Sequence, residues 1–415
     1  MDFNVTGERP QENIQSSQAF QSKPKLDSKG VSKITKIGAS FLQGFSFIAK
    51  GAEKVVLRMI DANKLNELEL NNGGKSYVFY VPFMKGIISK VKALKEEFAK
   101  ITEIKSKISS NELTGANLAL DVTEAKSETI GLGKGQYVLK VEAAKCDFKK
   151  EITPKATLAE KPSGQTPSID MKQRFSYAKD FVNGLNDLHK VGYAYGDMKP
   201  ENCLIYENEQ TKEKTLKISD FGKTQDMSKY EDGTCMYKGN LRFAPPEGKM
   251  SQKGDVYSAG LVLIRLFEEQ YLADGSIMEV EKKDKEVNAQ KNRRGIEKCI
   301  VEHKAFPGLD EPTLFDKIFR RLPRQATLTR QSDDKKEAQN NFLNEYIDTL
   351  GQRMFKDMSG SLPGASSSKE REKFVNNLTS LLKNMVVVNP NDRLTMEDVQ
   401  KNLKEVMEQL PGKQN

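Results

Sequence analysis

The chain has 415 residues, which is longer than one typical domain and sufficient for two lobes with attached segments. Hydrophobic residues account for 37% and charged residues for 30%, so the chain is strongly polar but can still bury cores. It contains no apolar run close to the roughly 18 residues that a membrane span needs, and we expect no transmembrane helix.

The charge balance favours anionic partners. The 66 Lys and Arg residues outnumber the 58 Asp and Glu residues, which gives a net charge of +8. Such an excess suits nucleotide phosphates, acidic protein faces or anionic lipid. Because the basic residues are spread along the chain rather than gathered in one patch, no nucleic-acid partner is expected.

The histidine and cysteine content limits the chemistry further. The chain has 2 histidines, too few for a His-rich metal or catalytic site. Its 4 cysteines have neither metal-ligand spacing nor the density of a disulfide framework. This pattern is typical of a reducing compartment, and we expect a cytoplasmic location.

Residues 1 to about 30 form a polar N-terminal segment. They are rich in Gln, Asn, Ser, Lys and Glu, with isolated apolar residues, so we predict that they are disordered. A basic stretch followed by an apolar one is absent, which excludes a general secretory signal peptide. The segment resembles the leader of bacterial type III effectors, and this resemblance leaves open secretion into a host cell.

Residues 45–143 are predicted to form a small antiparallel sheet that carries one helix. Aromatic and β-branched runs bounded by Gly and Asn indicate strands joined by turns. A recurrence of apolar residues every three or four positions indicates the helix. The predicted elements are strands at 45–48, 54–60, 77–81, 118–122 and 137–141 and a helix at 86–109.

Residues from 144 onward are predicted to be mostly helical. An apolar stripe runs through residues 175–190, and a nearly all-apolar helix follows Asp255. The last predicted helix covers 396–410. Gly, Pro and Ser between 359 and 369 indicate a flexible connector.

One constellation carries chemistry. Asp197, Lys199 and Asn202 share a short loop after the helix 175–190, and Asp220-Phe221-Gly222 follows a predicted strand pair. Phosphoryl transfer from ATP needs a carboxylate near the acceptor hydroxyl, a cation on the transferred phosphate and oxygen ligands for Mg²⁺. Asp197 can orient the hydroxyl, Lys199 can neutralise the phosphate, and Asn202 with Asp220 can hold the metal.

At these residues the chain resembles the protein kinase family, and the resemblance extends downstream. Pro245-Pro246-Glu247 stands where that family has Ala-Pro-Glu, Asp255 resembles the start of the buried F helix, and Arg393 matches the late Arg motif. The resemblance implies an α+β, bilobal fold with an N-lobe at 45–143 and a C-lobe at 144–410. It also implies that Asp255 holds the catalytic-loop backbone and that Arg393 pairs with Glu247.

The strand 137–141 contains Lys140 in a Val-Leu-Lys-Val sequence that resembles the third strand of a kinase, with its ATP-anchoring lysine. Too few residues separate Lys140 from Asp197 to hold two more strands and two helices. We therefore interpret the strand as the one that precedes the hinge. On that interpretation the backbone from Glu142 to Ala144 binds adenine.

Two loops are candidates for covering the phosphates. Residues 48–55 carry a single glycine, Gly51, where the family usually has three. The segment from Gly38 to Gly44 is the second candidate, and it would make Arg58 the lysine equivalent. We prefer the Gly51 loop because a strand should precede the loop, and 77–81 then becomes the third strand.

This choice places Tyr80 near the position of the anchoring lysine. Lys85 is the nearest lysine downstream and is the candidate replacement. Its predicted partner is Glu96 or Glu97 on the helix 86–109, with Glu97 taken as the site residue. An inactive pseudokinase that binds a partner protein therefore remains an alternative.

Tyr195-Gly196-Asp197 replaces the usual His-Arg-Asp. Without that Arg, a phosphorylated activation loop has no central basic group to bind, so we expect activity that does not depend on loop phosphorylation. Ala substitution of Ser228, Tyr230, Thr234 and Tyr237 should leave the rate nearly unchanged. Asn240 replaces the usual Thr near Asp197, and an amide can still hydrogen-bond there.

Residues 270–370 are predicted to be a largely helical insertion. Basic residues at 320–324 suit an acidic partner or anionic lipid. The sequence Arg324-Gln325-Ala326-Thr327 resembles a basophilic phosphorylation site, which suggests either an autoinhibitory role or phosphorylation of the chain by itself.

The function that we expect is ATP- and Mg-dependent phosphorylation of Ser and Thr residues on protein substrates. The pseudokinase scaffold is one alternative. A small-molecule kinase is another, because a Gly before Asp197 also occurs in kinases of the aminoglycoside and choline type. Lys199, two positions after Asp197, favours the protein kinases.

Overall fold

The computed structural model describes residues 45–50, 54–59, 76–82, 87–127, 136–152, 169–208, 210–240, 243–268, 340–341, 343–352, 354–355 and 367–410. Several predictions concern residues outside these ranges: the N-terminal segment 1–30, the candidate loop at 38–44, Gly51, Lys85, the basic residues at 320–324, the phosphorylation site at 324–327, and most of the 270–370 insertion with its connector at 359–369. Residues 343–352, which the structure describes, are helical.

The first half of the molecule is a five-stranded antiparallel sheet with the strand order β1-β2-β3-β5-β4. Its strands are β1 (Phe45–Lys50), β2 (Lys54–Met59), β3 (Tyr77–Pro82), β4 (Val122–Lys126) and β5 (Tyr137–Glu142). Strands β1 and β2 pair antiparallel, from Phe45 opposite Met59 to Lys50 opposite Val55. We call β1–β5 together with helix α3 (Ile87–Ser110) the sheet half.

One predicted strand is wrong in position. Residues 118–122 were expected to form a strand, but β4 begins only at Val122. Leu118 instead makes a single parallel bridge to Ile218, and the Ala119 amide donates to the Ile218 carbonyl at 2.8 Å. The apolar residues here are buried in a connection between α3 and β4. The apolar character of these residues reflects their burial and not pairing within a strand.

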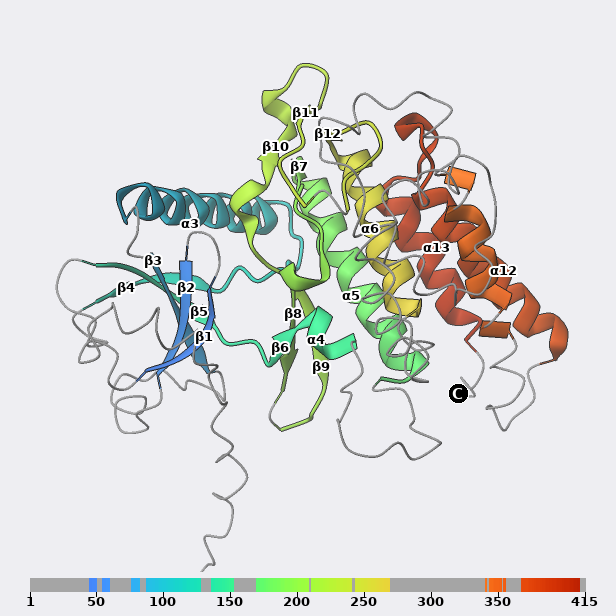
Figure 1. The fold of residues 1–415 in the computed structure, drawn as a ribbon, viewed down its shortest axis with the longest axis horizontal. Coiled ribbons are helices and arrows are strands. Elements are labelled where there is room, and N and C mark those ends of the chain that lie inside the picture. The colour runs from blue at the N-terminus through green and yellow to red at the C-terminus, as the bar shows by residue number, and fades with distance from the viewer. Residues whose placement is uncertain are drawn as a thin grey trace, which may run out of the picture.

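Helix α3 packs its apolar face against the sheet and into the main core. Leu94, Ile101 and Ile104 of α3 are buried in the same cluster as Val78 of β3 and Leu139 of β5. These α3 residues recur with the spacing of one helix face, which is why this segment forms an amphipathic helix over the sheet. Figure 1 shows α3 lying across the sheet and extending toward the rest of the molecule.

The second half is built from helices α5 (Met171–Lys190), α6 (Gln252–Glu268), α12 (Ser368–Met385) and α13 (Met396–Glu408). Asp170 caps the start of α5 by accepting from the Gln173 amide at 2.7 Å. From Val256 to Phe267, α6 is buried on nearly every side, which fits its apolar sequence. Figure 1 shows these helices side by side, and we call them the helical half.

Short elements join the two halves. Strands β6 (Cys146–Asp147), β8 (Cys203–Glu207) and β9 (Lys214–Ile218) form a small sheet with the order β6-β8-β9, and α4 (Phe148–Ile152) follows β6. Two further strand pairs are β7 (Tyr193–Ala194) with β10 (Gln225–Asp226) and β11 (Cys235–Met236) with β12 (Lys249–Met250). The motif residues lie between these strands. The whole arrangement is an α+β fold, as expected.

Candidate active site

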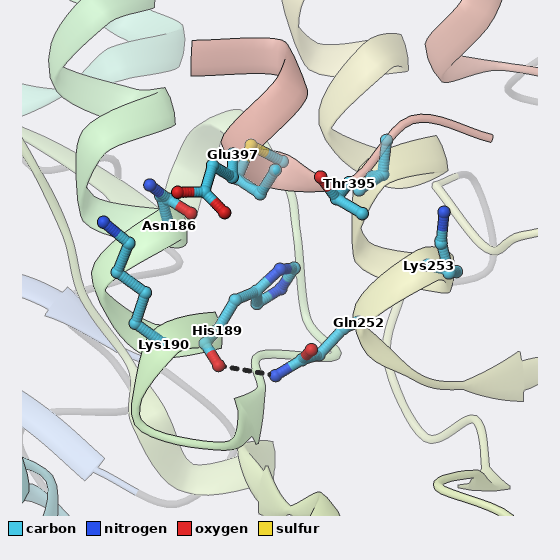
Figure 2. Close-up of a pocket in the computed structure, with 9 residues that line it drawn as sticks. Asn186, His189, Lys190, Gln252, Lys253, Thr395 and Glu397 are labelled. Atoms are coloured by element: carbon cyan, nitrogen blue, oxygen red, sulfur yellow. Dashed lines mark hydrogen bonds between the residues drawn. The ribbon is translucent and has the colours of Figure 1, made fainter. Parts of the chain in front are cut away.

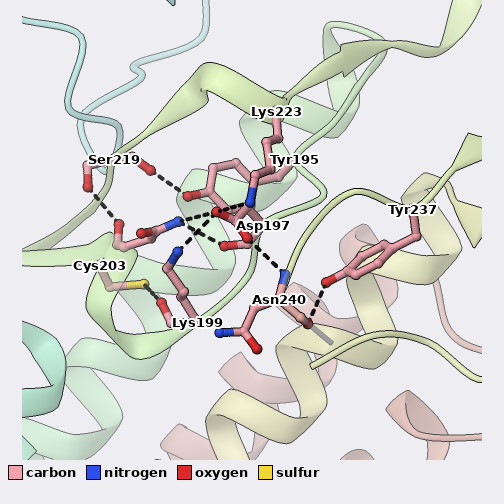
Figure 3. Close-up of polar contacts among 9 residues, drawn as sticks. Tyr195, Asp197, Lys199, Cys203, Ser219, Lys223, Tyr237 and Asn240 are labelled. Atoms are coloured by element: carbon pink, nitrogen blue, oxygen red, sulfur yellow. Dashed lines mark hydrogen bonds and ion pairs between the residues drawn. The ribbon is translucent and has the colours of Figure 1, made fainter. Parts of the chain in front are cut away.

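Asp197 lies in the loop between β7 and β8 and is only 2% exposed. Its Oδ2 accepts from Lys199 Nζ at 3.1 Å and from Asn202 Nδ2 at 3.2 Å. Its Oδ1 accepts from the Asn240 backbone amide at 3.0 Å. Figure 3 shows Lys199 and Asn240 reaching the carboxylate from two parts of the chain.

A second lysine reaches the same carboxylate. Lys223, the residue after Asp220-Phe221-Gly222, places Nζ 3.1 Å from Asp197 Oδ2. Burial raises the pKa of Asp197, but Lys199 and Lys223 together outweigh burial and lower it below its usual value. Asp197 is therefore ionised at neutral pH. Lys223 was not among the site residues predicted from the sequence.

Strand pairing brings Asn202 next to Asp220. Cys203 of β8 pairs with Ile218 of β9, and the Ser219 amide and hydroxyl both donate to the Asn202 carbonyl, at 2.9 and 2.8 Å. Asp220 follows Ser219 directly and adopts a left-handed backbone conformation with φ +61°. The two predicted metal ligands thus come from adjacent strand ends.

The donor set of these two residues fits Mg²⁺. Asn202 Nδ2 also donates to the Asp197 carbonyl at 2.9 Å, so the amide nitrogen faces Asp197 and leaves the amide oxygen as the atom suited to a cation. Magnesium is usually held by one or two carboxylates together with substrate phosphates rather than by an all-protein cage. Consistently, the described residues contain no cluster of three or more acidic, His or Cys side chains arranged for a metal.

Tyr195 links Asp197 to Asp220. Its ring is buried, and its hydroxyl donates to the Ser219 carbonyl. Burial raises the pKa of this phenol, and the nearby carboxylates of Asp220 and Asp197 raise it further. The Tyr195 ring also meets the buried Phe221 ring edge-on, with centroids 6.1 Å apart. Asp197 and Asp220 therefore flank the same side chain.

Asp255 holds the catalytic-loop backbone, as predicted. This buried residue of α6 accepts from the Tyr195 amide at 2.6 Å and from the Gly196 amide at 2.9 Å. Its Oδ2 also lies 3.1 Å from His189 Nε2. Three partners thus satisfy a carboxylate that would be costly to bury alone.

The predicted pair between Arg393 and Glu247 is also present. Arg393 Nη1 and Nη2 contact the two carboxylate oxygens of Glu247 at 2.7 and 2.6 Å. The Arg393 side chain is fully buried, and it donates further to the carbonyls of Lys253 and Val388. This bidentate pair fixes the end of the segment that begins at Asp220.

Two glycines bring that segment against the catalytic loop. Gly196 has φ +72°, a conformation that is strained for residues with a side chain. An Arg at this position would therefore have a strained backbone. A Cβ on Gly239 would lie only 2.0 Å from the Gly196 carbonyl oxygen. The next residue, Asn240, reaches Asp197 through its backbone amide rather than through the side-chain amide that the sequence had suggested.

Strand β3 contains no lysine. Alternate residues Val78 and Tyr80 face the main core, so Tyr80 occupies the inner face where the sequence had placed it. Lys140 of β5 pairs with Phe79 and lies over the Tyr77 ring at 4.4 Å, away from Leu139, which faces that core. Lys140 therefore lies on the side of β5 opposite the main core.

The structure also separates the two glutamates of α3. Glu97 is 8% exposed, whereas the Glu96 side chain is 65% exposed and lies 3.8 Å from Lys92. Glu97 is thus the inward-facing residue. Three positions further on, Lys100 Nζ donates to the Gly222 carbonyl at 2.9 Å, which ties α3 to the Asp-Phe-Gly segment.

Residues 142–145 connect the large sheet to the small one. The Ala143 amide donates to the Ser76 carbonyl at 2.7 Å, and the Lys145 amide donates to the Ile205 carbonyl at 2.8 Å. The Glu142 carboxylate pairs with Lys217 Nζ of β9 at 2.9 Å. Ala144 lies between the two tied amides, at the junction expected for a hinge.

The sequence pattern of the Protein kinase domain matches residues 134–403, well over half of the chain. The chain belongs to the protein kinase family. The matched region of this kinase holds the catalytic loop, the Asp-Phe-Gly segment and Arg393, whereas β1 to β4 and α3 precede it.

Curated kinases and receptors align with shorter stretches. A calcium and calcium/calmodulin-dependent serine/threonine-protein kinase of Lotus japonicus is 34% identical over 89 residues, 20% of this chain and 17% of that protein. Mitogen-activated protein kinase kinase 7 of Arabidopsis thaliana is 29% identical over 108 residues, 24% and 34% of the two chains. Atrial natriuretic peptide receptor 2 of Anguilla japonica is 32% identical over 126 residues, which are 27% of this chain and 11% of that protein. This kinase therefore matches about a third or less of the length of these relatives.

A cavity of about 280 Å³ lies elsewhere in the kinase, between α5, the start of α6 and the start of α13. Figure 2 shows His189, Gln252 and Thr395 around it. None of the predicted site residues lines this cavity. His189 connects the cavity to the catalytic loop. It lines the cavity and also contacts Asp255, which holds the backbone of that loop.

No helix among the residues that the structure describes has the length and apolar character needed to cross a bilayer.

Proposed function

We propose that this kinase is an ATP- and Mg²⁺-dependent protein serine/threonine kinase, with an N-lobe at 45–143 and a C-lobe at 144–410. The observation that carries the proposal is the contact of Asp197 with Lys199 and Asn202, next to Asp220. A protein substrate is favoured over a small molecule by Lys199, and the serine/threonine kinases among the relatives support the same reading.

Asp197 orients the acceptor hydroxyl toward the γ-phosphate and accepts its proton. The carboxylate is held ionised by its lysine neighbours, and a lowered pKa makes it a weak base. A weak base is sufficient here, because phosphoryl transfer depends mainly on positioning and charge neutralisation. Lys199 places its ammonium at the same oxygen and neutralises charge on the transferred group.

Asn202 and Asp220 would hold Mg²⁺ through oxygen atoms, and the metal would neutralise charge on the nucleotide phosphates. The backbone from Glu142 to Ala144 would bind adenine at the junction of the two sheets. Gly51 would cover the phosphates, and Lys85 paired with the inward Glu97 would replace the absent β3 lysine. Gly51 and Lys85 lie outside the described residues.

We further propose that activity does not require phosphorylation of the segment 220–247. The contact of Gly239 with Gly196 and the bond from the Asn240 amide to Asp197 support this, because they hold the segment on the catalytic loop without a phosphate. Gly196 has φ +72°, so an Arg at this position would carry a strained backbone.

The test is ATP turnover with a general protein substrate in the presence of Mg²⁺. Asp197→Ala and Asp220→Ala should each lower the rate by at least about 100-fold, since each removes a charged group from the reacting centre. Asp232→Ala, which removes an exposed carboxylate from the same segment, should leave the rate unchanged. Phosphoamino-acid analysis should find phosphoserine or phosphothreonine on the substrate and on the kinase itself.

A pseudokinase scaffold is the second candidate, and the absence of a lysine from β3 favours it. It predicts equal signals from the wild type and Asp197→Ala. The proposals of an acidic or lipid partner at 320–324 and of secretion as a bacterial effector rest on residues outside the described ranges.

A further inference from the structure

Lys223 places a second ammonium group at the centre of the site. Its Nζ and that of Lys199 each lie 3.1 Å from one oxygen, Asp197 Oδ2. The same oxygen also accepts from Asn202, whereas Oδ1 accepts from the Asn240 amide. One carboxylate oxygen therefore has two cationic neighbours, and a single ammonium is enough to balance one carboxylate.

The backbone that carries Lys223 is fixed. Gly222 is held by Lys100, and the Thr224 amide donates to the Phe221 carbonyl at 3.1 Å. Phe221 is itself buried against Tyr195. The position of the Lys223 side chain is thus set by the same segment that sets Asp220.

The ammonium end, in contrast, has room to move. The Lys223 side chain is 43% exposed, compared with 21% for Lys199 and 3% for Asp197. A long, half-exposed lysine on a fixed backbone can exchange between two acceptors at little cost. An anion that approaches Asp197 Oδ2 comes within reach of this ammonium.

The sheet half gives a chemical reason for such a role. Strand β3 contributes no lysine, so the cations that act on the nucleotide phosphates must come from other parts of the chain. Charge on the transferred phosphoryl group must still be neutralised in the transition state.

Resting on the proposed function, we propose that Lys223 is a second catalytic cation, which exchanges between Asp197 and the transferred phosphoryl group and acts on that group together with Lys199. The acceptor hydroxyl oxygen forms the new bond to the γ-phosphorus. The bond from that phosphorus to the bridging oxygen breaks with its electron pair leaving on ADP, and the hydroxyl proton passes to Asp197. Lys223 stabilises charge during this step and exchanges no proton or electron.

The experiment compares nucleotide binding and turnover in the full chain. The variants are Lys223→Met, Lys223→Arg and, as a matched control, Lys229→Met, which changes an exposed lysine of the same segment. Affinity is measured for the Mg²⁺ complexes of ADP and of a non-hydrolysable ATP analogue that carries the γ-phosphate. The kcat and the KM for ATP are measured separately.

Lys223→Met should lose about tenfold in affinity for the ATP analogue and leave ADP affinity unchanged, because only the γ-phosphate contact is removed. Its kcat should fall about 100-fold. Lys223→Arg should restore part of both, and Lys229→Met should match the wild type.

Other outcomes overturn the proposal. If Lys223→Met binds both nucleotides like the wild type and keeps its kcat, Lys223 is only a structural partner of Asp197. If its kcat rises, Lys223 restrains Asp197 instead. In both cases the proposed kinase function stands. A wild type that binds neither nucleotide and turns over no ATP would overturn the kinase function and this inference together.

Discussion

The helical half and the sheet half are held to the active site by different kinds of interaction. On the helical side, buried polar contacts hold the chain around the site: Asp255 accepts from the Tyr195 and Gly196 amides, and Arg393 pairs with the Glu247 carboxylate. On the sheet side, α3 packs through apolar residues and reaches the site with the ammonium groups of Lys100 and Lys107. Polar contacts of defined geometry hold individual groups in place, whereas apolar packing holds whole helices and strands in place.

The largest expected effect is on the buried ion pair of the helical side. Arg393→Met should lower the free energy of unfolding by about 3–5 kcal/mol, because it leaves the Glu247 carboxylate half-buried without its partner. Urea unfolding measures this difference. Lys383→Met breaks the exposed pair with Asp348 and should cost less than about 1 kcal/mol. Similar losses of unfolding free energy in the two variants would contradict the expected difference between the buried and the exposed ion pair.

The next prediction concerns the glycine contact. Gly239→Ala places a methyl group 2.0 Å from the Gly196 carbonyl oxygen, so the segment must move and the Asn240 amide must leave Asp197. A shift of about 1 Å at a reacting group lowers kcat by about 100-fold. The control is Gly233→Asn, where a Cβ meets nothing within 4 Å and Asn tolerates the φ of +61°. An active Gly239→Ala variant would show that the contact is not needed.

A smaller effect is expected where the sheet half meets the helical half. Lys107 Nζ of α3 lies 2.8 Å from Asp226 Oδ2 of β10. Burial raises the pKa of Asp226, but its hydrogen bonds from Lys107 and Ser228 lower the pKa to about 2. Lys107→Met should cost about 1 kcal/mol or less and should lower activity only modestly.

The pH dependence of that contact has a definite sign. Because the folded pKa of Asp226 lies below the unfolded value of about 3.9, the carboxylate stabilises the fold above that pH. This stabilisation is lost as the pH falls from about 4 toward 2. The difference in melting temperature between the wild type and Lys107→Met should therefore persist from pH 7 to 5 and shrink below pH 4. A difference that grows in acid would contradict the assignment.

The smallest effect is expected at the hydroxyl groups of the segment 220–247. A triple variant with Ser228→Ala, Tyr230→Phe and Thr234→Ala should change the rate by less than about threefold, because these groups make only local bonds. Steady-state kinetics measure the rate, and a large loss would show that phosphorylation is required. Tyr237 no longer belongs in this set, since it is 2% exposed and donates to the Asn240 carbonyl.

The sequence predicted the helical side in more detail than the sheet side. Asp255, Glu247 and Arg393 stand in short motifs whose spacing reflects a contact with one geometry, and those contacts are present. The strand expected at 118–122 was misplaced because an apolar run signals burial in a strand and in a buried connection alike. The Lys223 contact could not be derived from spacing, since a flexible lysine can reach many acceptors.

Glu97 and Glu96 illustrate the same limit. The sequence left Glu96 and Glu97 as alternative partners of the lysine, and the rotation of α3 against the sheet decides that Glu97 points inward. A rotation of this kind depends on many apolar contacts together, and no short motif records it.

The close approach of Gly196 and Gly239 constrains how the regulation of this kinase can evolve. Introducing Arg at position 196 by a single codon change would require a positive φ at a side-chain-bearing residue and displacement of Met250. The local backbone would have to change before such an Arg could help. An Arg at position 196 therefore needs a change of the local backbone as well as the substitution itself before it can bind a phosphate.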